Sequence, residues 1–317
     1  MPIQVLISAP AETVADYEPH LVRAFAEEDL DVALSAASDP ASSVDPAAVE
    51  YIVYHPRGPV TDYGAFPNLR AVLSLWAGVE SALANPTLTA PICRMVDPSL
   101  TQGMIEYVMG HALRYHLGMD AHIAGQDGVW RNEIVPPLAR HRRVGVLGLG
   151  ALGAEVAQAL ADFGFDVEGW SRRPRDPGRI VTHHGEDGLE ALLARSEILV
   201  TLLPNTPATE NLLNRRTLAL LPIGALLINA GRGGVVNDQA LVAALDEGPL
   251  GHATLDVFRV EPLPPGHPFW AHPKITVTPH VAAETRPDTA AETIALNIRR
   301  DQDGEALLYT VDRGHGY

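Results

Sequence analysis

Short apolar runs rich in β-branched residues alternate with helix-like or loop-like segments along the N-terminal third of the chain. The runs read IQVLISA, DVALSAA, EYIVYHP and LRAVLSLWAG. Apolar runs of this length, each followed by a segment of different periodicity, are typical of strands in a parallel α/β unit. The pattern therefore predicts a small parallel α/β domain in this part of the chain.

The segment 103–124 has a different pattern. It contains no proline, and its apolar residues recur at a spacing of three and four. This is the period of an amphipathic helix, so the sequence predicts one long helix here, which joins two domains.

The rest of the chain returns to β/α alternation. The stretch RRVGVLGLGALGAEVAQALADFGFDVEGWSRRP reads as a strand, a glycine turn, a helix and a second strand. Further runs follow in the order EILVTLLP, GALLINAGRGG, QALVAALDEG, HATLDVF and KITVTPH. The last stretch, DTAAETIALNIRRDQDGE, predicts a closing helix that returns to the first domain.

Length and composition agree with two globular domains. The chain has 317 residues, of which 46% are hydrophobic and 20% charged, and single cores stop growing at roughly 250 to 300 residues. No apolar run reaches the roughly 18 residues of a membrane span. The stretch MPIQVLISAPAE lacks the basic start and the cleavage site of a secretory signal. We therefore expect a cytoplasmic protein with no membrane partner.

Charge and rare residues exclude several kinds of chemistry. The formal net charge of −16 disfavours nucleic acid and anionic lipid as partners, and an anionic substrate would need a local basic group. Cys93 is the only cysteine, which excludes disulfides within the chain and cysteine-cluster zinc sites, and we expect no metal. Lys274 is the only lysine and has no GK[ST] loop around it, which argues against P-loop phosphoryl transfer.

Gly148, Gly150 and Gly153 form a GxGxxG pattern between an apolar strand and an alanine-rich helix. The first glycine permits a tight turn, the second lets the backbone approach a pyrophosphate, and the third lets the helix pack on the strand. A structural glycine turn is the alternative, but the strand and helix on either side favour a dinucleotide-binding site.

The residues that follow the next strand bear on cofactor choice. An NAD enzyme usually has an acidic residue about 20 residues after the glycines, which binds the ribose 2′-OH. This chain has Ser171, Arg172 and Arg173 there, and a hydroxyl with two guanidiniums suits a 2′-phosphate. We therefore predict NADP(H) as the preferred cofactor, with NAD(H) as the alternative, and expect Glu168 to point elsewhere. In the opposing interpretation both arginines are solvated loop charges.

Three polar residues stand at the ends of predicted strands: Arg232 in NAGRGG, Glu261 in DVFRVEP and His280 in VTPHVAA. Ligands bind at the carboxyl edge of parallel sheets, so these residues are candidates for one site. Taken singly, each has an ordinary alternative as a surface arginine, a solvated glutamate or a loop-capping histidine.

Together the motifs GLGALG, LLPNTPATENLLN, NAGRGG, LDVFRVEP and VTPHVAA resemble the D-isomer-specific 2-hydroxyacid dehydrogenases over almost the whole chain. The stretches SLWAGVE, ICRMVDP, GWSRRP, PHVAAETRP and VDRGHGY are most similar to the glyoxylate/hydroxypyruvate reductase A branch. The resemblance implies two Rossmann-like or flavodoxin-like parallel-sheet domains. The NAD(P)-binding domain, 99–285, is inserted within a substrate domain made of 1–98 and 286–317.

The resemblance also implies roles for the candidate residues, and the chemistry is consistent with them. His280 would protonate the alkoxide that forms when hydride reaches the keto carbon. Glu261 would orient the imidazole and raise its pKa, and Arg232 would bind the substrate carboxylate. Backbone N–H groups of Ala77 and Gly78 would also bind this carboxylate. Trp76 departs from the small residue expected beside them and would reshape the substrate pocket.

The remaining implied positions concern the cofactor. By the same similarity, the residues that contact it besides the three glycines and Ser171, Arg172 and Arg173 are Ala151, Leu152, Leu203, Pro204, Thr209, Ala230 and Asp256. Asp256 would meet the nicotinamide amide, and its alternative role is a strand-end cap.

Three functions stay open at this point. The leading hypothesis is an NADPH-dependent reductase of small 2-keto acids, glyoxylate and hydroxypyruvate first. The second is a family member that acts on a bulkier 2-keto acid or on phosphoglycerate, although the acidic chain disfavours phosphorylated substrates. The third is a non-catalytic dinucleotide-sensing protein, which would not need a proton donor. The resemblance further implies a homodimer, with the helix over 103–124 and the loop around Trp130 at its interface.

Overall fold

The chain folds into two compact parallel α/β units. The structure is a computed structural model that describes residues 1–38, 44–132, 135–175 and 178–314. One unit, here the terminal unit, comprises 1–100 and 284–317, and the central unit comprises 101–283. This confirms the predicted fold class of two parallel-sheet α/β domains. The boundaries lie two residues from those expected from the sequence.

The terminal unit is built on a five-stranded parallel sheet with the strand order β2-β1-β3-β4-β5. Its strands are β1 (Ile3–Ser8), β2 (Val32–Ala36), β3 (Tyr51–Tyr54), β4 (Ala71–Ser74) and β5 (Ile92–Cys93). Its helical segments are α1 (Ala11–Glu27), η1 (Tyr63–Ala65), α2 (Glu80–Leu83) and α9 (Pro287–Gln302). The strand order is that of flavodoxin-like folds. The sequence pattern missed β5, whose two residues are too few to show a period.

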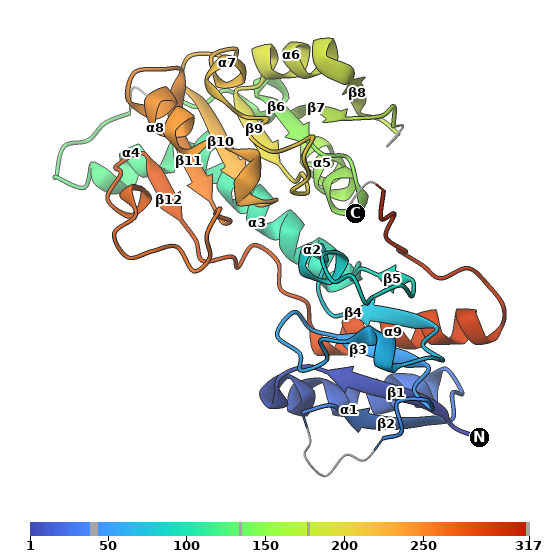
Figure 1. Cartoon of the computed structure of the whole chain (residues 1–317). Helices are drawn as coiled ribbons and strands as arrows, with labels where there is room; N and C mark the ends of the chain where they lie inside the picture. Colours follow the sequence, from blue (N-terminus) through green and yellow to red (C-terminus); the bar gives the residue numbers. More distant parts are fainter. Residues whose placement is uncertain (39–43, 133–134, 176–177, 315–317) are drawn as a thin grey trace. The chain divides into compact units, whose positions relative to one another are not determined.

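Alternate residues along β1, β3, β4 and β5 enter different cores. Val5 and Ile7 pack in the cluster that contains Leu21 of α1 and Ile294 of α9, whereas Leu6 packs in the other cluster. Side chains of a strand point alternately to its two faces, so a strand buried on both sides must be apolar at every position. The closing helix thus belongs to the terminal unit, where it packs beside α1 (Figure 1).

The segment expected to form one helix over 103–124 forms two. Helix α3 spans Pro98–His116 and α4 spans Met119–Ala124. Gly118 separates them with a φ of 64°, in the left-handed region that glycine adopts without steric cost. The helical period continues across this break, so the periodicity did not reveal it.

The central unit contains a seven-stranded parallel sheet with the order β12-β11-β10-β9-β6-β7-β8. The strands are β6 (Arg143–Leu147), β7 (Asp166–Ser171), β8 (Val181–His184), β9 (Ile198–Thr201), β10 (Ala225–Asn229), β11 (Leu250–Leu255) and β12 (Ile275–Val277). The helical segments after α4 are η2 (Ala139–His141), α5 (Ala151–Phe163), α6 (Gly185–Arg195), α7 (Arg215–Leu218), η3 (Gly233–Val235), α8 (Asp238–Asp246) and η4 (Pro268–Trp270). The order reverses between β6 and β9, which is the switch point where doubly wound sheets bind ligands.

Two apolar layers sandwich this sheet. Leu147 and Leu199 face the cluster formed with α6, α7 and α8, and Val144 and Val146 face the cluster formed with α3 and α5. Figure 1 shows these two groups of helices on opposite faces of the sheet. The carboxyl ends of the strands are thereby held at one edge, and the loops that follow them are brought together.

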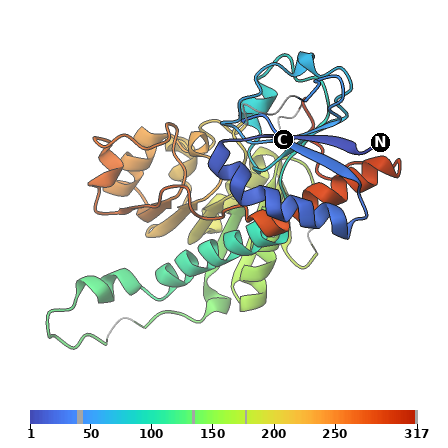
Figure 2. The ribbon, with the colours of Figure 1, turned by 90° about the horizontal axis from the view of Figure 1, so that it is seen from below.

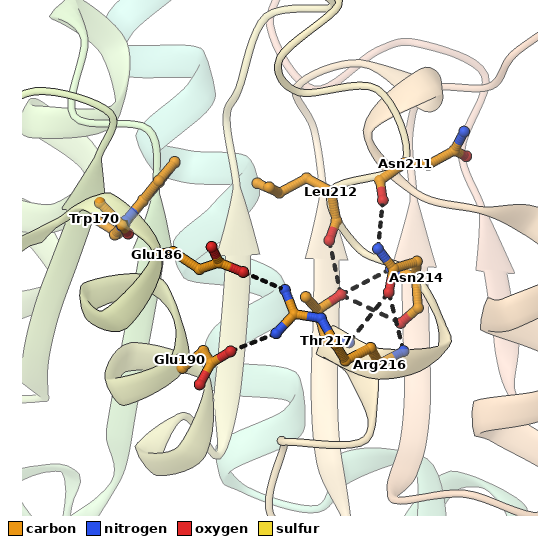
Figure 3. A network of polar contacts seen from close by, with 9 residues as sticks. Trp170, Glu186, Glu190, Asn211, Leu212, Asn214, Arg216 and Thr217 are labelled. Atoms are coloured by element: carbon orange, nitrogen blue, oxygen red, sulfur yellow. Dashed lines mark hydrogen bonds and ion pairs between the residues drawn. The ribbon is translucent and has the colours of Figure 1, made fainter.

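A polar network fastens α6 to α7 on one of these faces (Figure 3). Arg216 pairs with Glu190 and, at 3.0 Å, with Glu186. Asn214 caps α7 by accepting hydrogen bonds from the backbone of Arg216 and Thr217. The last residue of the LLPNTPATENLLN motif, Asn214, therefore stabilises the start of α7. Across the residues that the structure describes, no helix combines the length and apolar character needed to cross a membrane.

Candidate active site

The three polar residues that end predicted strands lie on three adjacent loops of the central unit. Arg232 follows β10, Glu261 follows β11 and His280 follows β12, and these strands pair side by side in parallel. Because parallel strands end at the same edge, the loops that carry the three residues are neighbours.

His280 and Glu261 are in direct contact. Nδ1 of His280 lies 2.7 Å from Oε2 of Glu261, and the backbone N–H of Phe258 donates to Oε1 of the same carboxylate at 2.8 Å. A carboxylate only accepts hydrogen bonds, so Nδ1 carries the proton and donates it. The imidazole is thereby oriented through Nδ1, which leaves Nε2 for a ligand.

The electrostatics of this pair favour its charged form. The hydrogen bond to Glu261, together with the negative charge of that carboxylate, raises the pKa of His280 above its ordinary value, against burial and the charge of Arg232. Burial alone would raise the pKa of Glu261, but the hydrogen bonds from His280 and Phe258 and the nearby positive charges lower it. An imidazolium beside a carboxylate is the form that can donate a proton near neutral pH.

The turn that carries Arg232 is shaped by Asn229 and by glycines. Asn229 is buried, and its side chain accepts a hydrogen bond from Gly231 N and donates one to Arg232 O, both at 3.2 Å. A Cβ on Gly233 would lie 2.0 Å from the carbonyl carbon of Phe258. Only glycine permits this approach, which brings the Arg232 turn against the loop of Glu261.

Arg259 and Asn211 brace the same turn, and the sequence analysis missed both. Arg259 donates to the carbonyl oxygens of Gly234 and Val236, at 3.1 and 2.8 Å, and to the side chain of Asn211. The backbone N–H of Asn211 donates to Gly234 O at 2.9 Å. Both residues stand inside motifs quoted for the family resemblance, and that position was the only available signal for them.

The glycine turn after β6 has the geometry that a pyrophosphate needs. Gly148 has a φ of 101°, and a Cβ on Gly153 would lie 1.8 Å from the carbonyl oxygen of Gly148. Gly150 is the N-cap of α5 and has no heavy atom within 4 Å of its Cβ position. No side chain caps α5, so the N–H groups at its start can bind an anion. Ala151 and Leu152 are the first residues of this helix.

Ser171, Arg172 and Arg173 lie at the end of β7. Oγ of Ser171 donates to Arg173 O at 2.6 Å, and both arginines are exposed. Glu168 pairs with His183 at 2.6 Å and with Arg195 at 3.2 Å. These two partners come from β8 and α6, and the expectation that Glu168 points away from the cofactor stays a prediction.

The other predicted cofactor residues follow β9, β10 and β11. Leu203 and Ala230 are buried, and Thr209 Oγ1 closes its own loop by donating to Pro204 O at 2.6 Å. Asp256 is 1% exposed. All of them belong to loops at the carboxyl edge of the sheet, as does the glycine turn.

Trp76, Ala77 and Gly78 follow β4 in the terminal unit. Trp76 is 44% exposed, and its ring meets that of His55 edge to face, with the ring centroids 5.4 Å apart. Its backbone N–H donates to Ser74 Oγ at 3.0 Å, and its carbonyl accepts from Met95 N at 3.0 Å. Their role in binding a substrate stays a prediction.

Comparison with known proteins agrees with the geometry of the glycine turn and of the His280–Glu261 pair. The model of the D-isomer specific 2-hydroxyacid dehydrogenase NAD binding domain matches residues 107–282, more than half of the chain. The chain belongs to this family. It is therefore an oxidoreductase, and the family resemblance seen in the sequence is confirmed.

Named relatives come from the same branch of the family. The glyoxylate/hydroxypyruvate reductase A of Serratia proteamaculans is 41% identical over 261 residues, which cover 78% of this chain and 82% of the relative. The reductase of the same name from Photorhabdus laumondii is 41% identical over 256 residues, with the same shares covered.

Solved structures of family members cover the whole fold. A D-isomer specific 2-hydroxyacid dehydrogenase of Xanthobacter autotrophicus, in complex with NADPH and MES, is 41% identical with a TM-score of 0.92 and full coverage of both chains. The NADPH-dependent glyoxylate/hydroxypyruvate reductase of Sinorhizobium meliloti, in complex with NADP and sulfate, is 34% identical with a TM-score of 0.88. The match covers 99% of this chain and 100% of that one.

Proposed function

We propose that this family member reduces small 2-keto acids with NADPH, glyoxylate to glycolate and hydroxypyruvate to D-glycerate. The observation that carries the proposal is the hydrogen bond of 2.7 Å between His280 and Glu261 on loops next to that of Arg232. Binding a dinucleotide does not require a proton donor, whereas reducing a ketone does. The names of the relatives and the NADPH and NADP in the related structures support the choice of substrate and cofactor.

In this proposal each residue has a distinct task. NADPH, when bound, supplies the hydride for the keto carbon. Arg232 pairs with the substrate carboxylate through its planar guanidinium and polarises the carbonyl. His280 gives its Nε2 proton to the carbonyl oxygen as that oxygen gains negative charge. Its Nδ1–H stays hydrogen-bonded to the Glu261 carboxylate. The carboxylate holds the ring and stabilises the imidazolium until the proton leaves.

The dinucleotide would be held by backbone and side chains of the central unit. The start of α5 at Gly150, Ala151 and Leu152 would bind the pyrophosphate, and Ser171, Arg172 and Arg173 the 2′-phosphate. Leu203, Pro204, Thr209, Ala230 and Asp256 would line the rest of the cofactor site. Ala77 and Gly78 would bind the substrate carboxylate with backbone N–H groups, and Trp76 would limit substrate size.

Absorbance at 340 nm tests the proposal with purified protein, NADPH or NADH, and glyoxylate, hydroxypyruvate or pyruvate. We expect NADPH oxidation with the first two substrates, and a loss of about a hundredfold or more in His280→Ala, the usual size of general acid catalysis. His272→Asn is the matched control, because His272 also contacts a carboxylate, Asp246 at 3.3 Å, but lies in the turn before β12. It should keep its rate within about twofold.

Two results would redirect the proposal. Turnover with bulkier 2-keto acids alone would keep the reaction and change the substrate. NADPH binding without oxidation of any 2-keto acid would favour the dinucleotide-sensing alternative.

We also propose a homodimer formed through the described residues of the segment that begins at Leu117 and contains α4. Its exposed apolar side chains are Leu117, Met119, Ile123, Val129, Trp130, Val135 and Leu138, with Trp130 88% exposed. Figure 2 shows α4 lying away from the sheet of its unit. Hydration of a run of exposed apolar residues is unfavourable, and such a run is typical of a surface that another chain covers. A cytoplasmic location stays a prediction of the sequence.

Light scattering after size exclusion tests the dimer. Wild type should elute with the mass of two chains, and a variant with Ile123→Asp and Trp130→Ser should elute with the mass of one. Trp270→Ser is the matched control, because Trp270 is also exposed but belongs to η4. A monomeric wild type would refute the dimer.

A further inference from the structure

His280 has a backbone conformation that its side chain disfavours. Its φ is 57°, in the left-handed region where a Cβ is crowded. A residue stays in this region only where its surroundings hold it there. The contacts that hold the His280 backbone therefore also determine where its imidazole points.

The buried Asp256 makes most of these contacts. Its carbonyl oxygen accepts a hydrogen bond from the backbone N–H of His280 at 2.9 Å. Its carboxylate accepts from the N–H of Val281 at 2.9 Å and from that of Ala282 at 3.0 Å. Asp256 thus binds the backbone at His280 and at the two residues after it.

Two hydroxyl groups extend this arrangement to α3. Thr278 Oγ1 donates to Asp256 Oδ1 at 2.6 Å, and Tyr107 OH lies 2.7 Å from Thr278 Oγ1. A threonine hydroxyl has one hydrogen, and here it points to the carboxylate. Tyr107 is therefore the donor to Thr278, and the two hydroxyls form a donor chain that ends on Asp256.

Helix α3 is well placed to fix the start of this chain. A Cβ on Gly103 would lie 3.5 Å from Cα of Ala283, so α3 runs against the residues just after the His280 loop. Val108 and Ala282 share one buried cluster. Burial raises the pKa of Tyr107 well above its ordinary value, so its hydroxyl keeps its proton and stays a donor.

We propose that Tyr107 is a positioning residue for His280, which acts through Thr278 and Asp256 without touching the substrate. The inference rests on the proposed function, in which His280 is the acid. The charged groups that face His280 are Glu261, Arg232 and Asp256. Tyr107 makes Asp256 a rigid support, and so keeps the imidazole within hydrogen-bond distance of Glu261.

The same helix offers a matched control. Tyr115 lies on the same face of α3, and its hydroxyl is 2.6 Å from Thr254 Oγ1 on β11. Thr254 in turn lies 3.4 Å from His111 Nδ1. Among the hydrogen bonds that the described residues show, those of Thr254 do not reach the Asp256 carboxylate. Tyr107→Phe and Tyr115→Phe thus remove the same group, a hydroxyl bonded to a threonine, from the same helix.

The experiment compares these two variants by two independent measurements. The first is kcat and KM for glyoxylate with NADPH, as a function of pH. The second is the imidazole pKa of His280 in the protein without cofactor, measured by NMR and assigned with His280→Ala. The second measurement needs no turnover, so it tests the positioning role even where the proposed reaction is not observed. NADPH affinity and thermal unfolding are measured in parallel.

For Tyr107→Phe we expect a fall in kcat of roughly five- to tenfold, the size expected for one hydrogen bond, with KM and NADPH affinity little changed. The pKa of His280 should fall towards its ordinary value, because a looser loop weakens its hydrogen bond to Glu261. Tyr115→Phe should change neither quantity. Thr278→Val should match Tyr107→Phe, and combining the two should add little, because both break one chain.

Other results would contradict either the positioning role of Tyr107 or the proposed reaction. An unchanged His280 pKa in Tyr107→Phe, or an equal shift in Tyr115→Phe, would overturn the positioning role. Loss of NADPH affinity with an unchanged His280 pKa would also overturn it and assign Tyr107 to the cofactor site. A shifted pKa in a protein whose wild type reduces no 2-keto acid would keep the positioning role and refute the proposed reaction.

Discussion

The loops at the carboxyl edge of the central sheet are built in two different ways. The turn after β6 depends on its backbone: Gly148 takes a left-handed φ and Gly153 packs directly on it. The loops after β10, β11 and β12 depend on side chains as well. Asn229 shapes the turn of Arg232 together with the close approach of Gly233. The Asp256 carboxylate binds the backbone N–H groups of the two residues after His280. A backbone-built turn appears in the sequence as a short local motif, whereas a side-chain-built site joins residues that are far apart in the chain.

The largest effect should come from removing the guanidinium of the side-chain-built site. We expect Arg232→Ala to lower kcat/KM for glyoxylate by about a hundred- to a thousandfold, because a preorganised charged donor is lost from both the substrate carboxylate and the carbonyl. Steady-state kinetics at 340 nm measures the loss.

Arg216→Ala is the control for this change. Arg216 is also an arginine of the central unit, but its partners Glu186 and Glu190 lie on α6 (Figure 3). It should leave kcat/KM within about twofold and lower stability by less than about 1 kcal/mol, as for exposed ion pairs. Equal activity in Arg232→Ala and wild type would remove Arg232 from the site.

Glu261→Gln should produce a smaller loss that depends on pH. The pKa of His280 is raised by Glu261, so protonated His280, the form that the proposed reduction needs, is present up to a higher pH than for an ordinary histidine. Above that pKa, His280 has lost the proton that it would donate, and the rate of reduction falls. Without the carboxylate charge the pKa falls, and the descending limb of the pH–rate profile should move to lower pH. We expect roughly ten- to a hundredfold slower reduction at pH 8 and a smaller loss at pH 6.

The reverse reaction provides an internal check on the sign. In the proposed mechanism the oxidation of glycolate needs neutral His280 as a base, so the rising limb of its pH–rate profile should also move to lower pH in Glu261→Gln. Limbs that move in opposite directions would show that His280 is not the group that titrates.

The difference between the two kinds of loop also explains what the sequence could predict. Most strands of both sheets, the glycine turn and the strand-end residues Arg232, Glu261 and His280 follow from period, composition and motif. Two strands and the break at Gly118 did not. Strand β5 is too short to show a period, β8 has polar residues at three of its four positions, and the break leaves the helical period intact.

Supporting residues were harder to find than the residues they support. Arg259 looks like a surface arginine in the sequence, yet it binds three groups around the turn of Arg232. Tyr107 looks like one more large residue on a helix, and its link to Thr278 spans a long stretch of chain. No local pattern encodes such contacts, because they exist only once the strands are paired and α3 is packed on the sheet.

The backbone-built turn can be tested by placing a methyl group at two glycines. In Gly153→Ala the new Cβ would lie 1.8 Å from the Gly148 carbonyl oxygen, so the turn must shift. We expect the free energy of unfolding to fall by about 1–3 kcal/mol, as for overpacked sites. Gly150 has a φ of −75° and open space, so Gly150→Ala should keep its stability and lose affinity for NADPH. Thermal unfolding measures the stability of the two variants, and fluorescence titration measures their affinity for NADPH. Equal unfolding temperatures for the two variants would contradict the clash expected at Gly153.

The smallest effect should come from the arginines after β7, because exposed charges act through solvent. A 2′-phosphate is present in NADPH and absent from NADH, so a residue that binds it should change kcat/KM for one cofactor only. We expect Arg172→Ala or Arg173→Ala to lower kcat/KM for NADPH by roughly five- to tenfold and to leave that for NADH unchanged. Arg179→Ala is the matched control, since Arg179 is an exposed arginine of the same region whose partner is Asp162 at 3.9 Å.

A loss of kcat/KM with both cofactors would mean that Arg172 and Arg173 shape the turn itself. In that case the end of β7 would resemble the side-chain-built loops, and the preference for NADPH would need a different explanation.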